Sequence, residues 1–392
     1  MITIPEHIAT LAPYEAGKPI SELARTKNLM RIIKLASNEN PLGPSPKALA
    51  AIEKAVNDLH RYVNPAAPEL VRAVSRKYHV TPQRIICGHG TDALLSYIVT
   101  ALSEPGDEVL TSEGSFIGMY VGTLKQGRRL RKIPLKNYAF NLDAIATAIS
   151  PRTRIVYLAN PNNPTGTMFG AGQFESFMAE VPRHVLVVLD EAYFTYALEH
   201  PNYPDGITYE YDNLIVTRSL SKAYGLAGIR VGLAVGPEDL IRALYKVKLP
   251  FEPNSLAQAA AVAALDDDDF LRLTVQTNTR NLSRMRLRFD ELGIRQVETV
   301  ADFILLLMPS EEFAETFFAR CLDQGLIVRH VKSFGIPNGI RLNSGTDEET
   351  TVALDIIEQV WTEMTAETVG AESTVSAGNP SNETRFIQNS RA

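Results

Sequence analysis

The segment "SLSKAYGLAGIR" at residues 219–230 places one lysine between two serines, with an arginine eight residues further along. The primary amine of Lys222 can form an imine with an aldehyde. Ser219, Ser221 and Arg230 could supply two hydroxyl donors and a planar guanidinium fork, which are groups that bind a phosphate. A lone lysine in such a turn is usually just solvated. The combination predicts a site for a molecule that carries both an aldehyde and a phosphate.

Pyridoxal 5′-phosphate is the cofactor that carries both groups, and it makes two further demands on the protein. Its ring nitrogen needs a carboxylate, and Asp190 closes the apolar run "HVLVVLD". Its ring oxygen needs donors, and Tyr193 in "DEAY" and Asn163 in "NPNNPTG" could supply them. Taken alone, Asp190 could equally be a helix cap or a salt-bridge partner, and "NPNNPTG" could be a plain turn.

A second anion-binding feature is "GHGTDA", where a strand passes through a glycine turn into an apolar helix. Backbone N–H groups near Thr91 and Asp92 would face a phosphate at the helix N-terminus. The same stretch fits a dinucleotide fingerprint, with Glu113 near the place of the ribose-binding acid. An NAD-dependent dehydrogenase is therefore an alternative, but it leaves Lys222 and Arg230 without a role.

Short apolar runs alternate with amphipathic stretches between residues 84 and 236, and long helical patterns follow from about residue 255. The first pattern predicts an α/β fold with a mostly parallel sheet flanked by helices, where ligands bind at the carboxyl ends of the strands. The second predicts a smaller α+β domain. We expect four segments: an N-terminal arm with part of the small domain (1–40), a large cofactor domain (41–254), the small domain (255–365) and a disordered tail (366–392).

Composition excludes several classes of protein. The 392 residues carry a formal charge of −6, so nucleic acid is not an expected partner. Two distant cysteines, Cys87 and Cys321, exclude a disulfide framework and favour the cytoplasm, as does a start without a targeting pattern. The longest apolar runs are too short to cross a membrane. The histidines lack metal-ligand spacing, so no metal is expected.

The set "NPNNPTG", "DEAY" and "SLSKAYGLAGIR" resembles the fold-type I pyridoxal-phosphate aminotransferases. The blocks "APYEAGKPI" and "IIKLASNENPLGPSPKAL" resemble the histidinol-phosphate aminotransferase branch of that family, and the resemblance extends to about residue 365. It implies the catalytic residues Lys222, Asp190 and Tyr193. The cofactor-binding residues that it implies, together with the anion site above, are Thr91, Asp92, Phe116, Asn163, Asp190, Tyr193, Ser219, Ser221, Lys222, Arg230 and Tyr62.

The resemblance also implies how subunits and substrates are arranged. Tyr62 would reach the cofactor of a neighbouring subunit, so a homodimer is expected. Arg341 would hold the anionic end of the substrate, and Arg329 and Tyr14 would assist when that end is a phosphate. The small-molecule partners would be an amino donor and a 2-oxo acid such as 2-oxoglutarate.

Some segments, such as "RYVNP" and "IRLNSGT", differ from the usual motifs of the family, and they leave the identity of the substrate open. Histidinol phosphate is the expected amino donor, in histidine biosynthesis. The alternatives are an aromatic or broad-specificity aminotransferase, a threonine-phosphate decarboxylase-like enzyme and a non-catalytic pyridoxal-binding regulator. The regulator is disfavoured because no basic DNA-binding segment precedes the domain.

Overall fold

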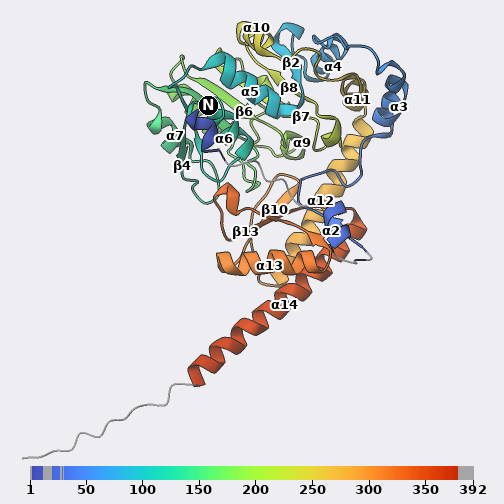
Figure 1. The fold of residues 1–392 in the computed structure, drawn as a ribbon, viewed down its shortest axis with the longest axis vertical. Coiled ribbons are helices and arrows are strands. Elements are labelled where there is room, and N and C mark those ends of the chain that lie inside the picture. Colours follow the sequence, from blue (N-terminus) through green and yellow to red (C-terminus); the bar gives the residue numbers. More distant parts are fainter. Residues whose placement is uncertain (1, 12–19, 27–28, 30, 378–392) are drawn as a thin grey trace, which may run out of the picture.

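The computed structural model describes residues 2–11, 20–26, 29 and 31–377. The chain forms a large domain and a smaller one (Figure 1). Helix α12 (Asp268–Glu291) runs from one to the other, and the last helix, α14 (Asp347–Ala377), projects away from the body. Within the described ranges, no helix is both long and apolar enough to cross a membrane.

The large domain is built on a seven-stranded sheet of order β2-β8-β7-β6-β5-β3-β4. All neighbours are parallel except at β8, which runs antiparallel to β2 and β7. The sheet is mostly parallel and flanked by helices, as the sequence predicts. The strands are β2 (Ile85–Gly88), β3 (Glu108–Ser112), β4 (Arg129–Ile133), β5 (Thr153–Ala159), β6 (Leu186–Asp190), β7 (Leu214–Ser219) and β8 (Gly232–Val235).

The inner strands are apolar because helices cover both faces of the sheet. Every residue of β6 and β7 is buried, including the polar residues at their carboxyl ends. The covering helices are α3 (Pro46–Ala55), α4 (Pro68–Tyr78), α5 (Gly90–Leu102), α6 (Ile117–Leu124), α7 (Leu142–Ala148), α8 (Ala171–Glu180), α9 (Phe194–Ala197) and α10 (Glu238–Val247).

The predicted boundary at residue 255 differs from the structure. Helix α11 (Ser255–Leu265) packs against α3 and α4, and four of its alanines lie in the core of the large domain. The segment "SLAQAAAVAAL" has few bulky side chains with which to build a core of its own, and small side chains allow helices to approach closely. The change of domain therefore comes later, along α12.

The small domain contains a four-stranded antiparallel sheet of order β12-β13-β10-β9 and a two-stranded parallel sheet, β1-β11. The N-terminal segment joins it, since β1 pairs with β11 and Leu23 of α2 packs against Leu322. Its elements are α2 (Ile20–Thr26), β1 (Ile33–Lys34), β9 (Arg295–Val297), β10 (Phe303–Leu307), α13 (Glu311–Asp323), β11 (Leu326–Ile327), β12 (Arg329–His330) and β13 (Gly339–Asn343). A short helix, α1 (Glu6–Ala9), precedes α2.

The expected disordered tail also differs from the structure over part of its length. Residues 366–377 continue α14, and Glu367 forms an ion pair with Arg320 of α13. The segment "AETVGAESTVSA" contains alanine and glutamate, which favour helix, and only one glycine. Residues 378–392 lie outside the described ranges.

The loop after β7 is held against the chain at residues 40–44. Gly225 has a φ of +68°, and a Cβ built on it would lie 2.1 Å from the carbonyl oxygen of Gly43. The Asn40 side chain donates a hydrogen bond of 2.9 Å to the carbonyl of Ala223. A glycine is therefore required where this loop crosses the other segment.

We expect Gly225→Ala to lower the free energy of unfolding by at least about 2 kcal/mol, because it adds both left-handed strain and a backbone clash. Denaturant unfolding of the cofactor-free chain measures this. Gly228→Ala is the matched control, since a Cβ at Gly228 would meet no atom within 4 Å and its φ is not left-handed. Equal stability of the two variants would contradict the close packing.

Candidate active site

A cavity of about 510 Å³ lies between the carboxyl ends of the large sheet and the small domain. Its walls come from the loops after β5, β6 and β7, from the start of α5, from α6 and from the strands β12 and β13. Twelve of the residues predicted from sequence line it: Thr91, Asp92, Phe116, Asn163, Asp190, Tyr193, Ser219, Ser221, Lys222, Arg230, Arg329 and Arg341.

Lys222 stands in this cavity, in the loop after β7. Its Nζ donates a hydrogen bond of 3.2 Å to the carbonyl of Ser37 and lies 5.7 Å from the ring centre of Tyr193. Burial lowers the pKa of Lys222, and nearby Arg341 also lowers it. A lowered pKa increases the fraction of neutral amine, which is the nucleophilic form.

Asp190, at the end of β6, is 4% exposed. Its carboxylate accepts hydrogen bonds from the Tyr157 hydroxyl at 2.7 Å, the Thr217 hydroxyl at 3.1 Å and the Ala192 amide at 3.2 Å. Burial raises the pKa of Asp190 to about 6 against the effect of these donors. Tyr157 and Thr217 were not predicted from the sequence, although strand register sets Thr217 directly beside Asp190.

An anion cradle is formed where α5 begins. No side chain caps this helix, and Gly90 at its first position has a φ of +76°. A Cβ on Gly90 would lie 2.7 Å from a guanidinium nitrogen of Arg230, which itself bonds to Asp92 at 3.1 Å. Ser219 and Ser221 line the same cavity. A helix N-terminus, two hydroxyls and a guanidinium fit a phosphate.

Tyr193, Asn163 and Arg341 are linked to residues of the N-terminal segment or to one another. The Tyr193 hydroxyl accepts a hydrogen bond of 2.8 Å from Asn38, a residue that was not predicted from the sequence. Arg341 donates to the side-chain oxygen of Asn163 and, at 2.7 Å, to the carbonyl of Ala36. Residues 36–38 therefore close the cavity from the side of the small domain.

One predicted residue, Tyr62, does not line the cavity of its own chain. It is 84% exposed, and its ring stacks on that of Phe251 with 4.2 Å between ring centres. Tyr14 lies outside the described residues.

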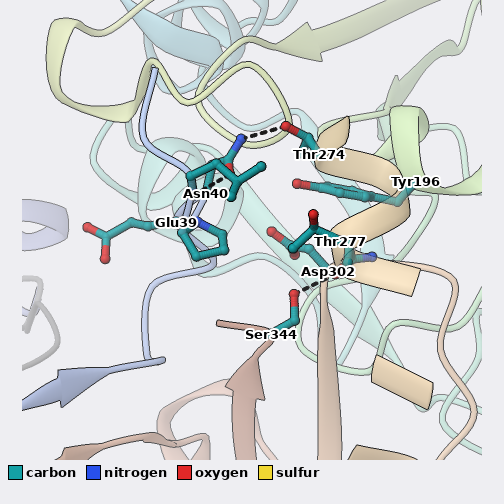
Figure 2. Close-up of a pocket in the computed structure, with 10 residues that line it drawn as sticks. Glu39, Asn40, Tyr196, Thr274, Thr277, Asp302 and Ser344 are labelled. Atoms are coloured by element: carbon teal, nitrogen blue, oxygen red, sulfur yellow. Dashed lines mark hydrogen bonds between the residues drawn. The ribbon is translucent and has the colours of Figure 1, made fainter. Parts of the chain in front are cut away.

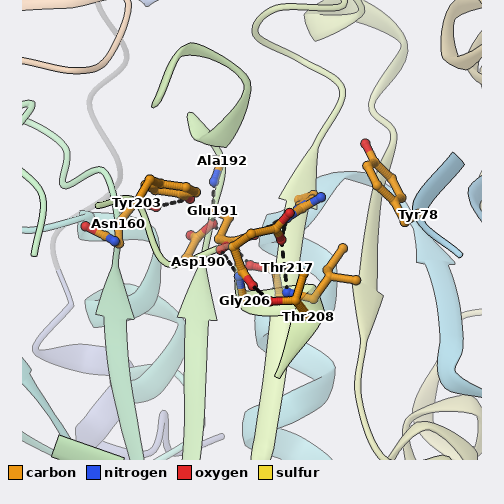
Figure 3. A network of polar contacts seen from close by, with 12 residues as sticks. Tyr78, Asn160, Asp190, Glu191, Ala192, Tyr203, Gly206, Thr208 and Thr217 are labelled. Atoms are coloured by element: carbon orange, nitrogen blue, oxygen red, sulfur yellow. Dashed lines mark hydrogen bonds and ion pairs between the residues drawn. The ribbon is translucent and has the colours of Figure 1, made fainter. Parts of the chain in front are cut away.

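A buried ion pair lies beside the site. Arg218, one residue before Ser219, contacts Glu191 at 2.7 Å and also pairs with Asp205. Glu191 further accepts a hydrogen bond of 2.7 Å from the Gly206 amide, and Figure 3 shows it beside Asp190 at the ends of the strands. The guanidinium carbon lies 3.8 Å from the ring centre of Phe194.

The residues of the cavity fit pyridoxal 5′-phosphate. The cradle at α5 suits the phosphate, and the amine of Lys222 suits the aldehyde. The described donors to Asp190 are all neutral, and burial raises the pKa of its carboxyl to about 6. A protonated ring nitrogen would compensate the charge of this carboxylate. The fold and the site thus define a fold-type I enzyme that uses pyridoxal phosphate.

Comparison with known proteins agrees with this class. A family model for aminotransferase class I and II matches residues 30–357. Histidinol-phosphate aminotransferase 2 of Pseudomonas fluorescens is 41% identical over 357 residues, covering 90% of this chain and 96% of the relative. That of Carboxydothermus hydrogenoformans is 40% identical over 341 residues, covering 86% and 94%.

A solved structure is also similar. The histidinol-phosphate aminotransferase from Sinorhizobium meliloti, in complex with pyridoxal 5′-phosphate, has a TM-score of 0.85 and 27% identity, covering 92% of this chain and 98% of that one. The chain belongs to the class I and II aminotransferases. It is a pyridoxal-phosphate-dependent aminotransferase, and the dehydrogenase alternative is set aside.

We expect Lys222→Ala to abolish turnover and to remove the visible absorbance of lysine-linked cofactor, because no amine replaces its Nζ. Absorbance spectra of the purified variant measure this. Lys125→Ala is the matched control, since Lys125 also lines the cavity but follows α6 and not β7. A Lys222→Ala variant with a normal spectrum and rate would contradict the assignment.

Proposed function

We propose that the enzyme transfers the amino group of histidinol phosphate to 2-oxoglutarate, giving imidazole acetol phosphate and glutamate in histidine biosynthesis. The names of the relatives support this substrate. The observation that carries the proposal is a pair of arginines in the cavity. Arg329 on β12 lies directly opposite Arg341 on β13, so both side chains lie on the same face of the sheet.

The two arginines also share an aromatic neighbour. Their guanidinium carbons lie 6.0 Å and 5.9 Å from the ring centre of Phe334, and both residues line the active-site cavity. Two guanidinium groups on one face of the cavity wall suit an anionic substrate group, because a planar fork binds a phosphate or a carboxylate bidentately.

Each residue of the cavity then has a proposed role toward the cofactor. Asp190 would keep the ring nitrogen protonated, and Phe116 would stack on the ring. Tyr193 and Asn163 would donate to the ring oxygen. The phosphate would be held by the backbone N–H groups at Thr91 and Asp92, where α5 begins, and by the side chains of Ser219, Ser221 and Arg230.

The chemistry of the chain itself centres on Lys222. When bound, the cofactor supplies an electron sink for the electron pair released at the α-carbon of the substrate. Lys222, displaced by the substrate amine, would take the proton from that carbon and deliver it to the cofactor carbon. Arg341 would hold the carboxylate or phosphate end, so that the α-carbon faces the amine of Lys222. Burial of the site, with its lowered lysine pKa, favours the neutral amine that this requires.

A half-reaction screen tests the substrate. Histidinol phosphate, phenylalanine, threonine phosphate and glutamate are added separately to the enzyme, and the loss of lysine-linked cofactor absorbance is followed. We expect the largest rate constant per molar with histidinol phosphate, and conversion with glutamate as well. Faster conversion by phenylalanine would favour an aromatic aminotransferase. Release of carbon dioxide from threonine phosphate would favour the decarboxylase.

The same half-reaction rates, measured in variants of Arg329, test whether this residue binds the substrate phosphate. We expect Arg329→Ala to reduce the histidinol phosphate half-reaction about tenfold to a hundredfold more than the glutamate one, because only the former brings a phosphate. Tyr14→Phe should act in the same direction. Arg320→Ala is the control, since Arg320 pairs with Glu367 outside the cavity. Equal effects of Arg329→Ala on both half-reactions would contradict a phosphate role.

We further propose that the active unit is a homodimer in which Tyr62 completes the neighbouring site. Tyr62 and Phe251 form an exposed aromatic pair, and Leu59 and Leu249 are also largely exposed. Such clustered apolar exposure is typical of an interface. The free, buried cysteines Cys87 and Cys321 fit the reducing cytoplasm that we propose as its location.

We expect a sedimentation coefficient for a dimer, and complementation between two inactive variants. Mixing Lys222→Ala with Tyr62→Ala and allowing exchange should restore about a quarter of the wild-type activity, because half of the dimers are mixed and each has one intact site. As controls, each variant is taken through the same exchange procedure alone, and neither should recover activity. A fully active monomer, or no recovery despite demonstrated exchange, would contradict shared sites.

A further inference from the structure

A second, smaller cavity lies beside the active-site cavity, between the N-terminal segment and α12 (Figure 2). Its volume is about 10 Å³, the space that one water molecule needs. The wall is mostly polar. Glu39 lines both cavities, and the other polar residues of the small one are Asn40, Tyr196, Thr274, Thr277, Asn278, Asp302 and Ser344.

Asp302 is the unusual residue of this wall. It is 3% exposed, and neither carboxylate oxygen accepts a hydrogen bond from another residue that the structure describes. Its main chain is fixed, because its carbonyl accepts a hydrogen bond of 3.0 Å from the Ser344 amide. Burying a carboxylate without donors is costly, so a residue held here needs compensation from water or from nearby cations.

The main chain at Asp302 lies next to two cations of the active site, since Phe303 contacts Arg341 and the Tyr193 ring that Lys222 also approaches. Burial raises the pKa of the Asp302 carboxyl to about 7, whereas Lys222 and Arg341 lower it. The next residue, Phe303, packs its ring 5.2 Å from that of Tyr193 and 5.3 Å from the guanidinium carbon of Arg341. The other titratable groups near Asp302 are Tyr193 and Tyr196, whose hydroxyls are neutral at ordinary pH, and Glu39 across the small cavity.

We propose that Asp302 is a positioning residue of the transamination site: its carboxylate, solvated by one water in the small cavity, is the internal counter-charge to Lys222 and Arg341. The inference rests on the proposed role of Lys222 but not on the identity of the amino donor. It explains why an acid without direct partners occupies a buried position at the edge of the catalytic cavity.

Removing the negative charge of Asp302 should affect Lys222 and Arg341 in different ways. The negative charge favours the protonated form of the Lys222 nitrogen, so removing it lowers the pKa of that nitrogen further. The same charge offsets the field of Arg341, so removing it strengthens binding of an anionic substrate there. A residue with only a packing role would produce neither effect.

Asp302→Asn keeps the shape of the side chain and removes its charge. In the holoenzyme without substrate, absorbance is titrated against pH, which reports protonation of the lysine-linked nitrogen. We expect the variant to titrate about one pH unit lower than the wild type. We also expect a severalfold lower KM for 2-oxoglutarate. Asp267→Asn is the matched control, because Asp267 is a buried acid that pairs with Lys47 outside both cavities.

Stability provides a readout that needs no cofactor. The pKa of Asp302 in the folded chain, about 7, lies above the usual value for aspartate, so the folded state binds the extra proton between about pH 4 and 7. The contribution of this group to stability is therefore present below about pH 4 and lost as pH rises through about 7. We expect Asp302→Asn to raise Tm relative to wild type more at about pH 8 than at about pH 5.

The proposal is overturned if Asp302→Asn titrates like the wild type and Asp267→Asn, or if KM for 2-oxoglutarate is unchanged. Should Asp302→Asn fail to fold, Thr277→Val tests the same point, since it keeps the carboxylate and removes a hydroxyl from the small cavity. It should move the absorbance titration in the same direction by less. No shift in Thr277→Val would then overturn the proposal. Failure of histidinol phosphate as a substrate leaves the titration unaffected.

Discussion

The buried ion pair between Arg218 and Glu191 is the constraint on which the geometry of the site depends. Arg218 is 1% exposed; burial would lower its pKa, but Glu191 raises it above the usual value, so the guanidinium stays charged. Removing one partner of such a pair costs about 3–5 kcal/mol, because the other is left buried and uncompensated. Each partner is the chain neighbour of a site residue, Glu191 of Asp190 and Arg218 of Ser219. The pair thus fixes the carboxyl ends of β6 and β7 relative to each other, and with them the proposed contacts to ring nitrogen and phosphate.

Much of the large domain could be predicted from sequence because its signals are local. Buried parallel strands are continuous apolar runs, and polar residues that follow them lie at one edge of the sheet, which is why Asp190 and Lys222 could be identified together. Packing between segments that are distant in sequence leaves no comparable pattern in the local sequence. The alanines of α11 are helical by propensity, but only the presence of α3 and α4 assigns them to the large domain. Likewise, composition alone suggested disorder for residues 366–377, which the structure shows as a continuation of α14.

The residues that sequence reasoning missed are those whose role depends on contacts between distant segments. Tyr157 is an ordinary apolar strand residue in sequence, and only the sheet brings its hydroxyl to Asp190. Asn38 lies 155 positions from Tyr193, to which it donates. Asp302 begins the apolar segment "DFILLLM" and has the sequence pattern of a solvated residue before a strand, yet it is buried near Lys222. In each case a polar group is buried because distant segments cover it, a fact that no local pattern contains.

The hydrogen bond between Arg341 and Asn163 would connect the proposed binding of substrate to the proposed binding of cofactor. Arg341 donates to Asn163, and Asn163 is a proposed donor to the ring oxygen of the cofactor. A carboxylate or phosphate that reaches the guanidinium competes with Asn163 for its N–H donors. Anion binding would therefore weaken the hydrogen bond from Arg341 to Asn163. Because Arg341 is also held by the carbonyl of Ala36, the fork keeps its place while one contact is exchanged. Under the proposed role of Arg341, a 2-oxo acid and a phosphate ester would use the same arginine in alternate half-reactions without moving the β13 strand that carries it.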